Sequence, residues 1–340
     1  MAFLLRSVRK SDYPDLKALG RELNTVNLPS DPKALKKIIQ RSVDSFRGKY
    51  KKHRDKAQFL FVVEDTRKQR VVGTSKIFAR HGTPQRPHVY FEVHREKVAS
   101  KTLGVNFSRK FYRLKTDTRG YTEIGGLVLD KRHRGHEEKL GKQLSLIRFM
   151  YMRGHPIWFK RRVIAELLPP LHEGRPSTLY AFYGFNLTRM PYRQADLLSF
   201  KNKEFILKLF PRSDLYFDIL PPEVQRDIER TGPGSEVARR LLTKIGFRYA
   251  EQIDPFDGGP YYTALMPQIK VYQKTRPLKY VGETNNSAKR PYLILKEEVG
   301  EVLGTVTPLK MSRRGMLLPP EVGELLQATR GDKFFIYPWS

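Results

Sequence analysis

Residues 121–153 read YTEIGGLVLDKRHRGHEEKLGKQLSLIRFMYMR, and the order of elements in this segment is the main indication of the fold class. Residues 121–129 place apolar and aromatic side chains around two glycines and predict a strand. A charged loop that contains Gly135 and Gly141 follows. Residues 142–153 are dense in Leu, Ile, Phe and Met, which predicts a helix buried on most of its surface. We therefore expect a strand, a basic glycine-containing loop and a helix in direct succession.

The loop between these two elements suits the binding of an anion. Backbone N–H groups at a helix N-terminus bind phosphate directly, because they have no partner within the helix and point toward the ligand. Arg134, next to Gly135, adds a positive charge. A basic turn that only leads into a core helix has the same composition, so the loop alone leaves both interpretations open.

The segments on both sides extend the pattern. Before the loop the sequence predicts a strand, two helices, a β-hairpin and a further strand, and after the buried helix it predicts a short strand. This order is similar to that of GNAT-type acyl-CoA N-acyltransferases. In those enzymes the strand before the loop runs beside the pantetheine arm of coenzyme A. The predicted elements cover residues 3–8, 13–23, 58–63, 71–77, 89–93 and 163–167, and the second helix begins near Asp31.

A second local signature occurs twice, namely a helix that ends at Gly-Phe and is followed by a strand. The two copies end at Gly184-Phe185 and Gly246-Phe247, and strands are expected over 186–190 and 248–253. The repeat indicates a second GNAT-like lobe. An ordinary helix with a glycine after its last turn is the alternative.

The C-terminal part changes character and predicts several short strands with tight turns. The expected fold class is therefore α/β (α+β), with two GNAT-like lobes at 1–170 and 171–273 and a small β-barrel at 274–340. The predicted strands of the barrel are 291–296, 302–306 and 333–337.

The chain is strongly basic, with 64 Lys and Arg against 35 Asp and Glu and a formal net charge of +29. The basic runs at 47–56, 131–134 and 160–162 are short and scattered among core-forming segments. They fit a solvated surface, the attraction of a phosphate-bearing ligand or the binding of nucleic acid. Nucleic acid has the least support, because no basic tail or RNA-binding aromatic motif accompanies the runs.

Other classes of protein are excluded by residues that are missing. The chain has no cysteine, which excludes disulfides, thiolate metal ligands and a cysteine nucleophile. Its 8 histidines show no HxxxH or HExxH spacing, so we expect no metal. No apolar run is long enough to span a membrane, and the run before Arg6 is too short for a signal peptide. A cytoplasmic protein with no membrane partner is expected.

The residues resemble one family in particular, the arginine N-succinyltransferases. Leu127-Val-Leu-Asp130 is similar to that family's Leu-Phe-Leu-Asp before the loop, and Arg148-Phe-Met-Tyr-Met152 to its Arg-Phe-Met-Phe-Met helix. The most specific part is Ile253-Asp-Pro-Phe-Asp-Gly-Gly-Pro260, shortly after Gly246-Phe-Arg-Tyr249. The resemblance extends over nearly the whole chain.

This resemblance implies an N-acyltransferase of arginine catabolism. Its co-substrate would be an acyl-CoA, most simply succinyl-CoA, and its acceptor the amino group of arginine or a similar amino acid, with no metal. Leu127, Val128 and Leu129 would lie beside the pantetheine arm, with an amide near Leu127 or Leu129 polarising the thioester carbonyl. Arg134, Gly135 and Gly141 would hold the pyrophosphate. A homo- or hetero-oligomer fits the family.

Two departures from the family pattern bear on catalysis. The family's proton-donating histidine lies fourteen residues before the glycine of the second Gly-Phe pair, and Gly232 stands at that position here, with no histidine after His172. Lys139 replaces a glycine of the loop. Glu166 is then expected to take the proton from the amine, and Tyr183 (or its neighbour Tyr180) to serve as the acid. Core packing of the tyrosines and a salt bridge of Glu166 are the structural alternatives.

Three functional hypotheses follow from these residues. The first is direct transfer of an acyl group from CoA to an amine, with both substrates held side by side. The second is a non-catalytic GNAT-fold relative that binds CoA or a protein partner, which the glycine at position 232 favours. The third, with the least support, is a basic nucleic-acid-binding protein.

Overall fold

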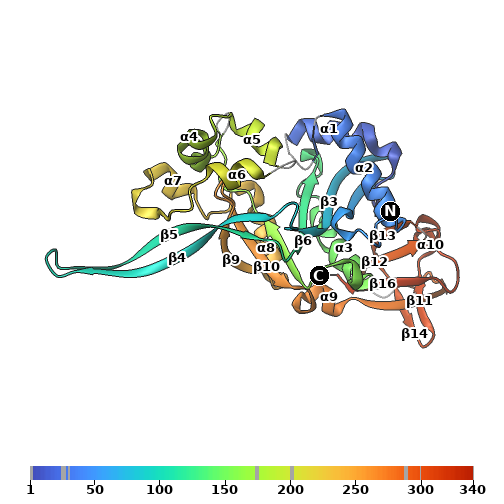
Figure 1. The fold of residues 1–340 in the computed structure, drawn as a ribbon. Coiled ribbons are helices and arrows are strands. Elements are labelled where there is room, and N and C mark those ends of the chain that lie inside the picture. Colours follow the sequence, from blue (N-terminus) through green and yellow to red (C-terminus); the bar gives the residue numbers. More distant parts are fainter. Residues whose placement is uncertain are drawn as a thin grey trace. The chain divides into compact units, whose positions relative to one another are not determined.

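The computed structural model describes residues 3–23, 28–29, 31–172, 176–199, 203–286, 290–298 and 300–339. The chain divides into two compact units, each assembled from segments that are distant in sequence (Figure 1). Unit 1 comprises Met1–Arg80, Thr122–Arg161 and Leu265–Ser340, and unit 2 comprises His81–Tyr121 and Arg162–Ala264. Within the described part of the chain, no helix combines the length and the apolar character that a membrane crossing requires.

Unit 1 is built on one mostly antiparallel sheet with the strand order β14-β15-β11-β16-β12-β13-β1-β2-β3-β6. The predicted strands and helices around the loop are confirmed in their order. The elements of its N-terminal and central parts are β1 (Phe3–Ser7), α1 (Tyr13–Leu23), α2 (Pro32–Phe46), β2 (Gln58–Asp65), β3 (Arg70–His81), β6 (Tyr121–Leu129) and α3 (Leu140–Gly154).

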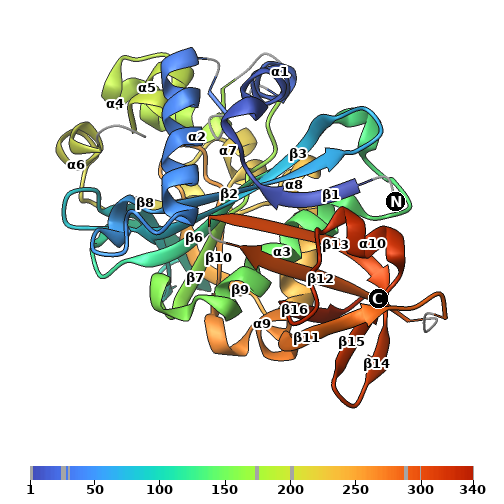
Figure 2. The same ribbon diagram turned by 90° about the vertical axis from the view of Figure 1, so that its right-hand side faces the viewer.

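Helices cover both faces of the unit 1 sheet because β2 is apolar on both sides. Successive side chains of a strand point to opposite faces. Leu60 and Val62 pack with the apolar side chains of α1 and α2. Phe59 and Phe61 face the other way and contact the ring of Tyr151 on α3. Figure 2 shows α1 and α2 on one side of these strands and α3 on the other.

The C-terminal strands are present as predicted, but they continue the unit 1 sheet. β13 pairs antiparallel with β1, so that Leu5 lies opposite Gly304. The C-terminal segment thus belongs to the same compact unit as the N-terminal segment, and an open series of strands takes the place of the expected barrel among the described residues. The expectation that residues 1–170, 171–273 and 274–340 fold as separate domains stays a prediction. The elements are α9 (Lys270–Lys274), β11 (Arg276–Glu283), β12 (Pro291–Glu298), β13 (Glu301–Pro308), β14 (Lys310–Ser312), β15 (Gly315–Leu318), α10 (Pro320–Leu325) and β16 (Lys333–Pro338).

The sheet strands of unit 2 are ordered β7-β10-β9-β4-β5-β8. β4 and β5 form a long hairpin that starts with His88 opposite Asp117 and closes with Ser100 opposite Val105 (Figure 1). Helices pack an apolar core against this sheet. The elements are β4 (His88–Ser100), β5 (Val105–Asp117), β7 (Arg162–Glu166), α4 (Phe185–Thr188), α5 (Tyr192–Ser199), α6 (Glu204–Leu209), β8 (Leu215–Tyr216), α7 (Pro222–Asp227), α8 (Pro233–Ile245), β9 (Arg248–Ile253) and β10 (Pro260–Leu265).

The expected repeat of the Gly-Phe signature is wrong at its first copy. Gly246 ends α8 with φ 114, and β9 follows as predicted. Gly184 instead has φ −64 inside a continuous helical segment, in which a π-helical turn passes into α4 where a strand was expected. A Cβ at Gly184 would lie 2.4 Å from the ring of Tyr180. Close packing of an aromatic ring therefore accounts for this glycine, and a left-handed helix end accounts for the other.

Candidate functional site

Strand β6 is bent immediately before the residues expected to line the acyl-CoA site. Gly126 has φ 56, a left-handed conformation that bends a strand locally. The Gly126 carbonyl accepts a hydrogen bond from Thr74 Oγ1 at 2.9 Å. The Gly125 carbonyl accepts one from Arg148 Nη1 at 3.4 Å. Side chains from β3 and α3 therefore hold the bend, which sets the path of residues 127–129.

Arg148 places a buried positive charge beside this bend. The residue is 3% exposed, and its guanidinium also donates to the carbonyl and the hydroxyl of Ser145 at 3.1 and 2.9 Å. Burial lowers the pKa of Arg148 to about 9, so the group stays mostly charged at neutral pH. Among the described residues no carboxylate lies within ion-pair distance of it. The carbonyl and hydroxyl of Ser145, together with the Gly125 carbonyl of the bend, replace the water that the charge has lost.

The three residues after the bend approach β3 closely. A Cβ on Gly73 would lie 2.8 Å from both the Leu129 Cδ1 atom and the Val128 carbonyl oxygen. Leu127, Val128 and Leu129 are each partly exposed. Their placement along one strand end is as predicted, and their contact with a pantetheine arm stays a prediction.

The loop after β6 is anchored by Asp130. Its buried carboxylate accepts hydrogen bonds from the backbone N–H of Arg132 at 2.9 Å and from the Arg132 guanidinium at 2.7 Å. These bonds, with the side-chain bond from Arg132 dominant, hold the pKa of Asp130 well below its ordinary value. Arg134 is exposed, and its Nε donates to the Leu129 carbonyl at 3.3 Å. The loop therefore returns Arg134 to the end of β6.

The loop then opens into the N-terminus of α3. Gly135 is exposed with φ 73, and Lys139 precedes the helix with φ 54. Both conformations are left-handed, so Lys139 takes up a backbone shape that glycine adopts at lower cost. Neither Gly135 nor Gly141 has a heavy atom within 4 Å of the position that a Cβ would occupy. Space for a ligand therefore exists above both glycines, beside the first N–H groups of the helix.

In unit 2, Glu166 lies at the end of β7 and is hydrogen-bonded rather than free. Tyr261 donates from its hydroxyl to Glu166 Oε2 at 3.2 Å and to Asp254 Oδ2 at 3.1 Å. Asp254 in turn accepts from the backbone N–H of Phe256 at 2.7 Å. Tyr261 thus ties the strand end that carries Glu166 to the turn over residues 254–260.

Two further carboxylates of this region are poorly solvated. Burial, with the charge of Asp254 second, raises the pKa of Asp196 to about 6. Burial likewise raises the pKa of Asp257 well above its ordinary value, again with Asp254 adding to the effect. Asp196, Asp254 and Asp257 therefore form a local acidic cluster in a chain whose net charge is +29. Such a cluster favours a bound cation.

The two tyrosines considered as acids lie in the core of unit 2. Tyr183 packs against the rings of Phe91 and Phe210 with centroids 6.0 and 5.6 Å apart. Burial raises the pKa of Tyr183 to about 12, which makes it a weak proton donor near neutral pH. Tyr180 stacks on Phe256. These contacts bring Tyr183 together with apolar rings, whereas Glu166 is joined to Tyr261.

Gly232 lies where backbone segments meet at the start of α8. Its N–H donates to the Leu168 carbonyl at 2.8 Å. A Cβ at this position would lie 2.3 Å from the carbonyl oxygen of Pro169. A side chain at position 232 therefore requires the backbone around it to move.

Sequence reasoning missed one pair in this region, because its members are 55 residues apart. His172 Nε2 lies 3.0 Å from the Asp227 Oδ2 atom, and Thr178 donates to the same oxygen at 3.0 Å. Asp227 is buried at the end of α7, whereas the His172 side chain is 55% exposed. No local pattern marks such a pair. In the part of the chain that the structure describes, no group of three or more His, Asp or Glu side chains is placed to hold a metal ion.

Comparison with known proteins assigns the family. A family model described as "Arginine N-succinyltransferase beta subunit" matches residues 3–271. The chain belongs to the arginine N-succinyltransferase family. This confirms the resemblance seen in the motifs around the loop and in the turn over residues 253–260.

Relatives from this family match the chain over almost its full length. An arginine N-succinyltransferase of Photorhabdus laumondii is 31% identical over 336 residues, covering 97% of this chain and 96% of the relative. "Arginine N-succinyltransferase subunit beta" of Pseudomonas aeruginosa is 28% identical over 340 residues, covering 99% and 98%. The solved structure of arginine/ornithine succinyltransferase subunit AI from Pseudomonas aeruginosa superposes with a TM-score of 0.84 at 22% identity, covering 99% and 98%. The α/β fold class is confirmed by this match.

Proposed function

We propose that this protein transfers a succinyl group from succinyl-CoA to the amino group of arginine. The observation that supports it most is the bent strand β6 followed by the open loop and α3, in a chain that matches arginine N-succinyltransferases over almost its whole length. In this proposal residues 127–129 lie beside the pantetheine arm, and a backbone N–H of Leu127 or Leu129 polarises the thioester carbonyl.

The pyrophosphate of the donor binds over the loop from Arg134 to Gly141. Arg134 is exposed and directed back to β6, and the space above Gly135 and Gly141 admits phosphate oxygens close to backbone N–H groups. The high net charge of the chain raises the local concentration of such an anion.

The acceptor is a cation that reacts through a neutral amine. The carboxylates of Asp196, Asp254 and Asp257 suit the binding of the positively charged part of arginine. Glu166 then takes the proton that the attacking amine loses. Its bond to Tyr261 at 3.2 Å orients the carboxylate, and the positioning of both substrates contributes roughly 7–11 kcal/mol in favourable intramolecular cases.

The activity assay measures release of the CoA thiol and detects the product, N-succinylarginine, by mass spectrometry. Arg134→Glu should raise the Kd of succinyl-CoA in calorimetry by at least about tenfold, since it removes one phosphate contact and adds repulsion. Lys310→Glu makes the same change of charge on β14 and serves as the control, with little expected effect. Equal Kd values of the two variants for succinyl-CoA would contradict the proposed binding of the donor at this loop.

A non-catalytic relative is the second candidate, because position 232 carries no side chain and admits none without a shift of the backbone. That candidate requires the wild-type protein to bind succinyl-CoA and arginine and to form no N-succinylarginine. The name "subunit beta" of the Pseudomonas aeruginosa relative supports assembly into an oligomer under either candidate, which light scattering of the purified protein would measure.

A further inference from the structure

The outer part of the β4–β5 hairpin has no further strand beside it. β9 pairs with β4 at Phe91 and Glu92, and β8 pairs with β5 at Phe111 and Tyr112. Within the part of unit 2 that the structure describes, residues 96–109 therefore form a two-stranded ribbon that extends beyond the rest of the strands of this unit (Figure 1). A two-stranded ribbon is only marginally stable in water by itself. Apolar side chains on this ribbon therefore gain from a covering surface.

The two faces of the ribbon differ in character. Successive side chains of a strand point to opposite faces, and directly paired residues share a face. Val98 lies opposite Phe107, and Ser100 lies opposite Val105. Phe107 is 45% exposed and Val105 is 40% exposed, so one face presents apolar groups to solvent. We call it the apolar face, and its residues are Glu96, Val98, Ser100, Val105, Phe107 and Arg109. The opposite face carries the exposed side chains of Lys97, Ala99, Asn106 and Ser108.

The charges on the apolar face are balanced. Arg109 Nη1 lies 3.9 Å from the Oε1 atom of Glu96 on the paired strand. The Arg109 guanidinium also lies over the rings of Phe107 and Tyr216, with centroids 5.9 and 5.4 Å away. The charges of Glu96 and Arg109 therefore cancel on this face, in a chain whose net charge is +29.

The same side of the hairpin stays charge-paired toward its base. Glu92 Oε2 lies 2.8 Å from His94 Nε2. Arg113, opposite Glu92, donates to Asp214 at 2.7 Å. His94 also stacks on Phe111, which lies opposite it, with ring centroids 5.2 Å apart. Aromatic rings and paired charges thus continue the apolar face without an excess of positive charge.

A second copy of this chain fits the apolar face better than an anionic partner does. Nucleic acid is bound by an excess of Lys and Arg that neutralises its phosphates, and the charges of this face cancel. Two chains of net charge +29 repel each other, and the repulsion is weakest where a surface is neutral. In a twofold contact the same patch meets itself. Glu96 and Arg109 of one copy then have opposite charges available on the other copy.

We propose that two copies of this chain associate through the apolar face and form a twofold-symmetric dimer. The two ribbons pack face to face at about 10 Å, the spacing of packed sheets. Removal of Val98, Val105 and Phe107 from water drives the association. The inference is independent of the proposed acyl transfer, because the dimer is measured without substrates.

The test measures the mass of the full-length protein by light scattering at micromolar concentrations. The wild-type protein should show twice the chain mass of 39.7 kDa. Phe107→Glu places a charge without a partner inside the contact and should raise the dissociation constant of the dimer by at least about 10²-fold. Ser108→Glu adds the same charge one residue away on the opposite face, so it is the matched control and should keep the dimer. Circular dichroism checks that both variants fold.

Cross-linking gives a second measurement that leaves the contact intact. Because the chain has no cysteine, one introduced thiol reports on one position. Val98→Cys should form a covalent dimer with a bis-maleimide that spans about 10 Å, whereas Ala99→Cys, on the opposite face, should stay a single chain on a denaturing gel. A monomeric wild-type protein, or a Phe107→Glu protein that remains dimeric, overturns the proposal. Equal cross-linking of the two cysteine variants, or a mass increase that requires added RNA, overturns it as well.

Discussion

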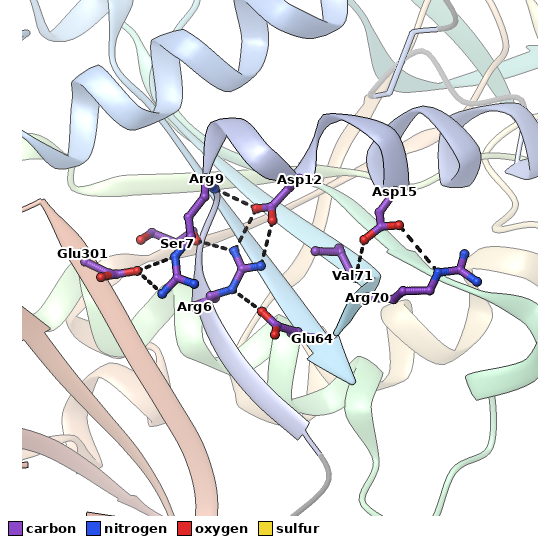
Figure 3. Close-up of polar contacts among 9 residues, drawn as sticks. All are labelled: Arg6, Ser7, Arg9, Asp12, Asp15, Glu64, Arg70, Val71 and Glu301. Carbon is purple, nitrogen blue, oxygen red and sulfur yellow. Dashed lines mark hydrogen bonds and ion pairs between the residues drawn. The ribbon is translucent and has the colours of Figure 1, made fainter. Parts of the chain in front are cut away.

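Arg6 on β1 and Asp12 before α1 form a buried, two-pronged ion pair, with Nη2–Oδ1 and Nη1–Oδ2 distances of 2.7 and 2.8 Å (Figure 3). The Arg6 Nε also donates to Glu64 on β2 at 2.6 Å. Asp12 accepts a further bond from the backbone N–H of Arg9 at 2.7 Å. One guanidinium therefore joins β1, the start of α1 and β2 within unit 1.

Replacing Asp12 with Asn should destabilise unit 1 by about 2–4 kcal/mol, because a buried cation loses one of its two carboxylates. Asp15→Asn is the matched control. Asp15 lies in the first turn of α1, but its partner Arg70 is 49% exposed and lies 3.5 Å away, so the loss should be within about 1 kcal/mol. Urea unfolding followed by circular dichroism measures both, and equal losses would contradict the argument.

Gly232→His should cost at least about 2 kcal/mol of unfolding free energy, because its Cβ would meet the backbone of Pro169 and force it to move. Gly234→His is the control two residues away, in the first turn of α8, where no heavy atom lies within 4 Å of the added Cβ. It should be neutral or slightly stabilising. A fully stable Gly232→His protein would show that the segment around Pro169 yields easily.

Lys139→Gly should stabilise the protein by about 1 kcal/mol, since Lys139 has φ 54 and glycine adopts this conformation without a Cβ clash. Lys139→Ala keeps the Cβ and should bring no such gain, which separates backbone relief from the loss of charge. Thermal melts of the two variants give the comparison. A larger gain from alanine than from glycine would point to charge instead.

Asp196→Asn should raise stability at pH 7.5 by about 1–3 kcal/mol and have little effect near pH 4. Burial raises the pKa of folded Asp196 to about 6 from its ordinary value of 3.8. Between these values the folded state keeps a proton that the unfolded state releases, so stability falls as pH rises, and the whole cost is present above pH 6. Denaturant unfolding at both pH values measures it.

The exposed Asp218 provides the control for this pH dependence. Asp218→Asn should change the unfolding free energy little at either pH. If Asp196→Asn stabilises the protein equally at pH 4 and pH 7.5, the gain comes from packing or hydrogen bonding, and the ionisation of Asp196 is not its cause.

Residues close together in sequence determined the elements around the loop. The strand over 121–129, the glycines of the loop and the apolar helix after it were all predicted, because each signal lies within a few residues of the backbone it shapes. The left-handed end of α8 at Gly246 is likewise determined by residues close together in sequence. The second strand of the long hairpin, β5, was missed, since basic side chains interrupt its apolar alternation and much of it faces water on both sides.

The pairing of distant strands and the grouping of side chains at the candidate site depended on contacts between segments far apart in the sequence. Gly184-Phe185 and Gly246-Phe247 have the same two residues, yet the first glycine lies inside a helical segment against the Tyr180 ring, while the second is left-handed. The pairing of β13 with β1 and the meeting of His172 with Asp227 join residues far apart in the chain. Local sequence patterns indicated most of the strands and helices around the loop and the family that the chain resembles. Which side chains come together at a site follows from the packing of distant segments, because burial and hydrogen bonding there are properties of the packed chain.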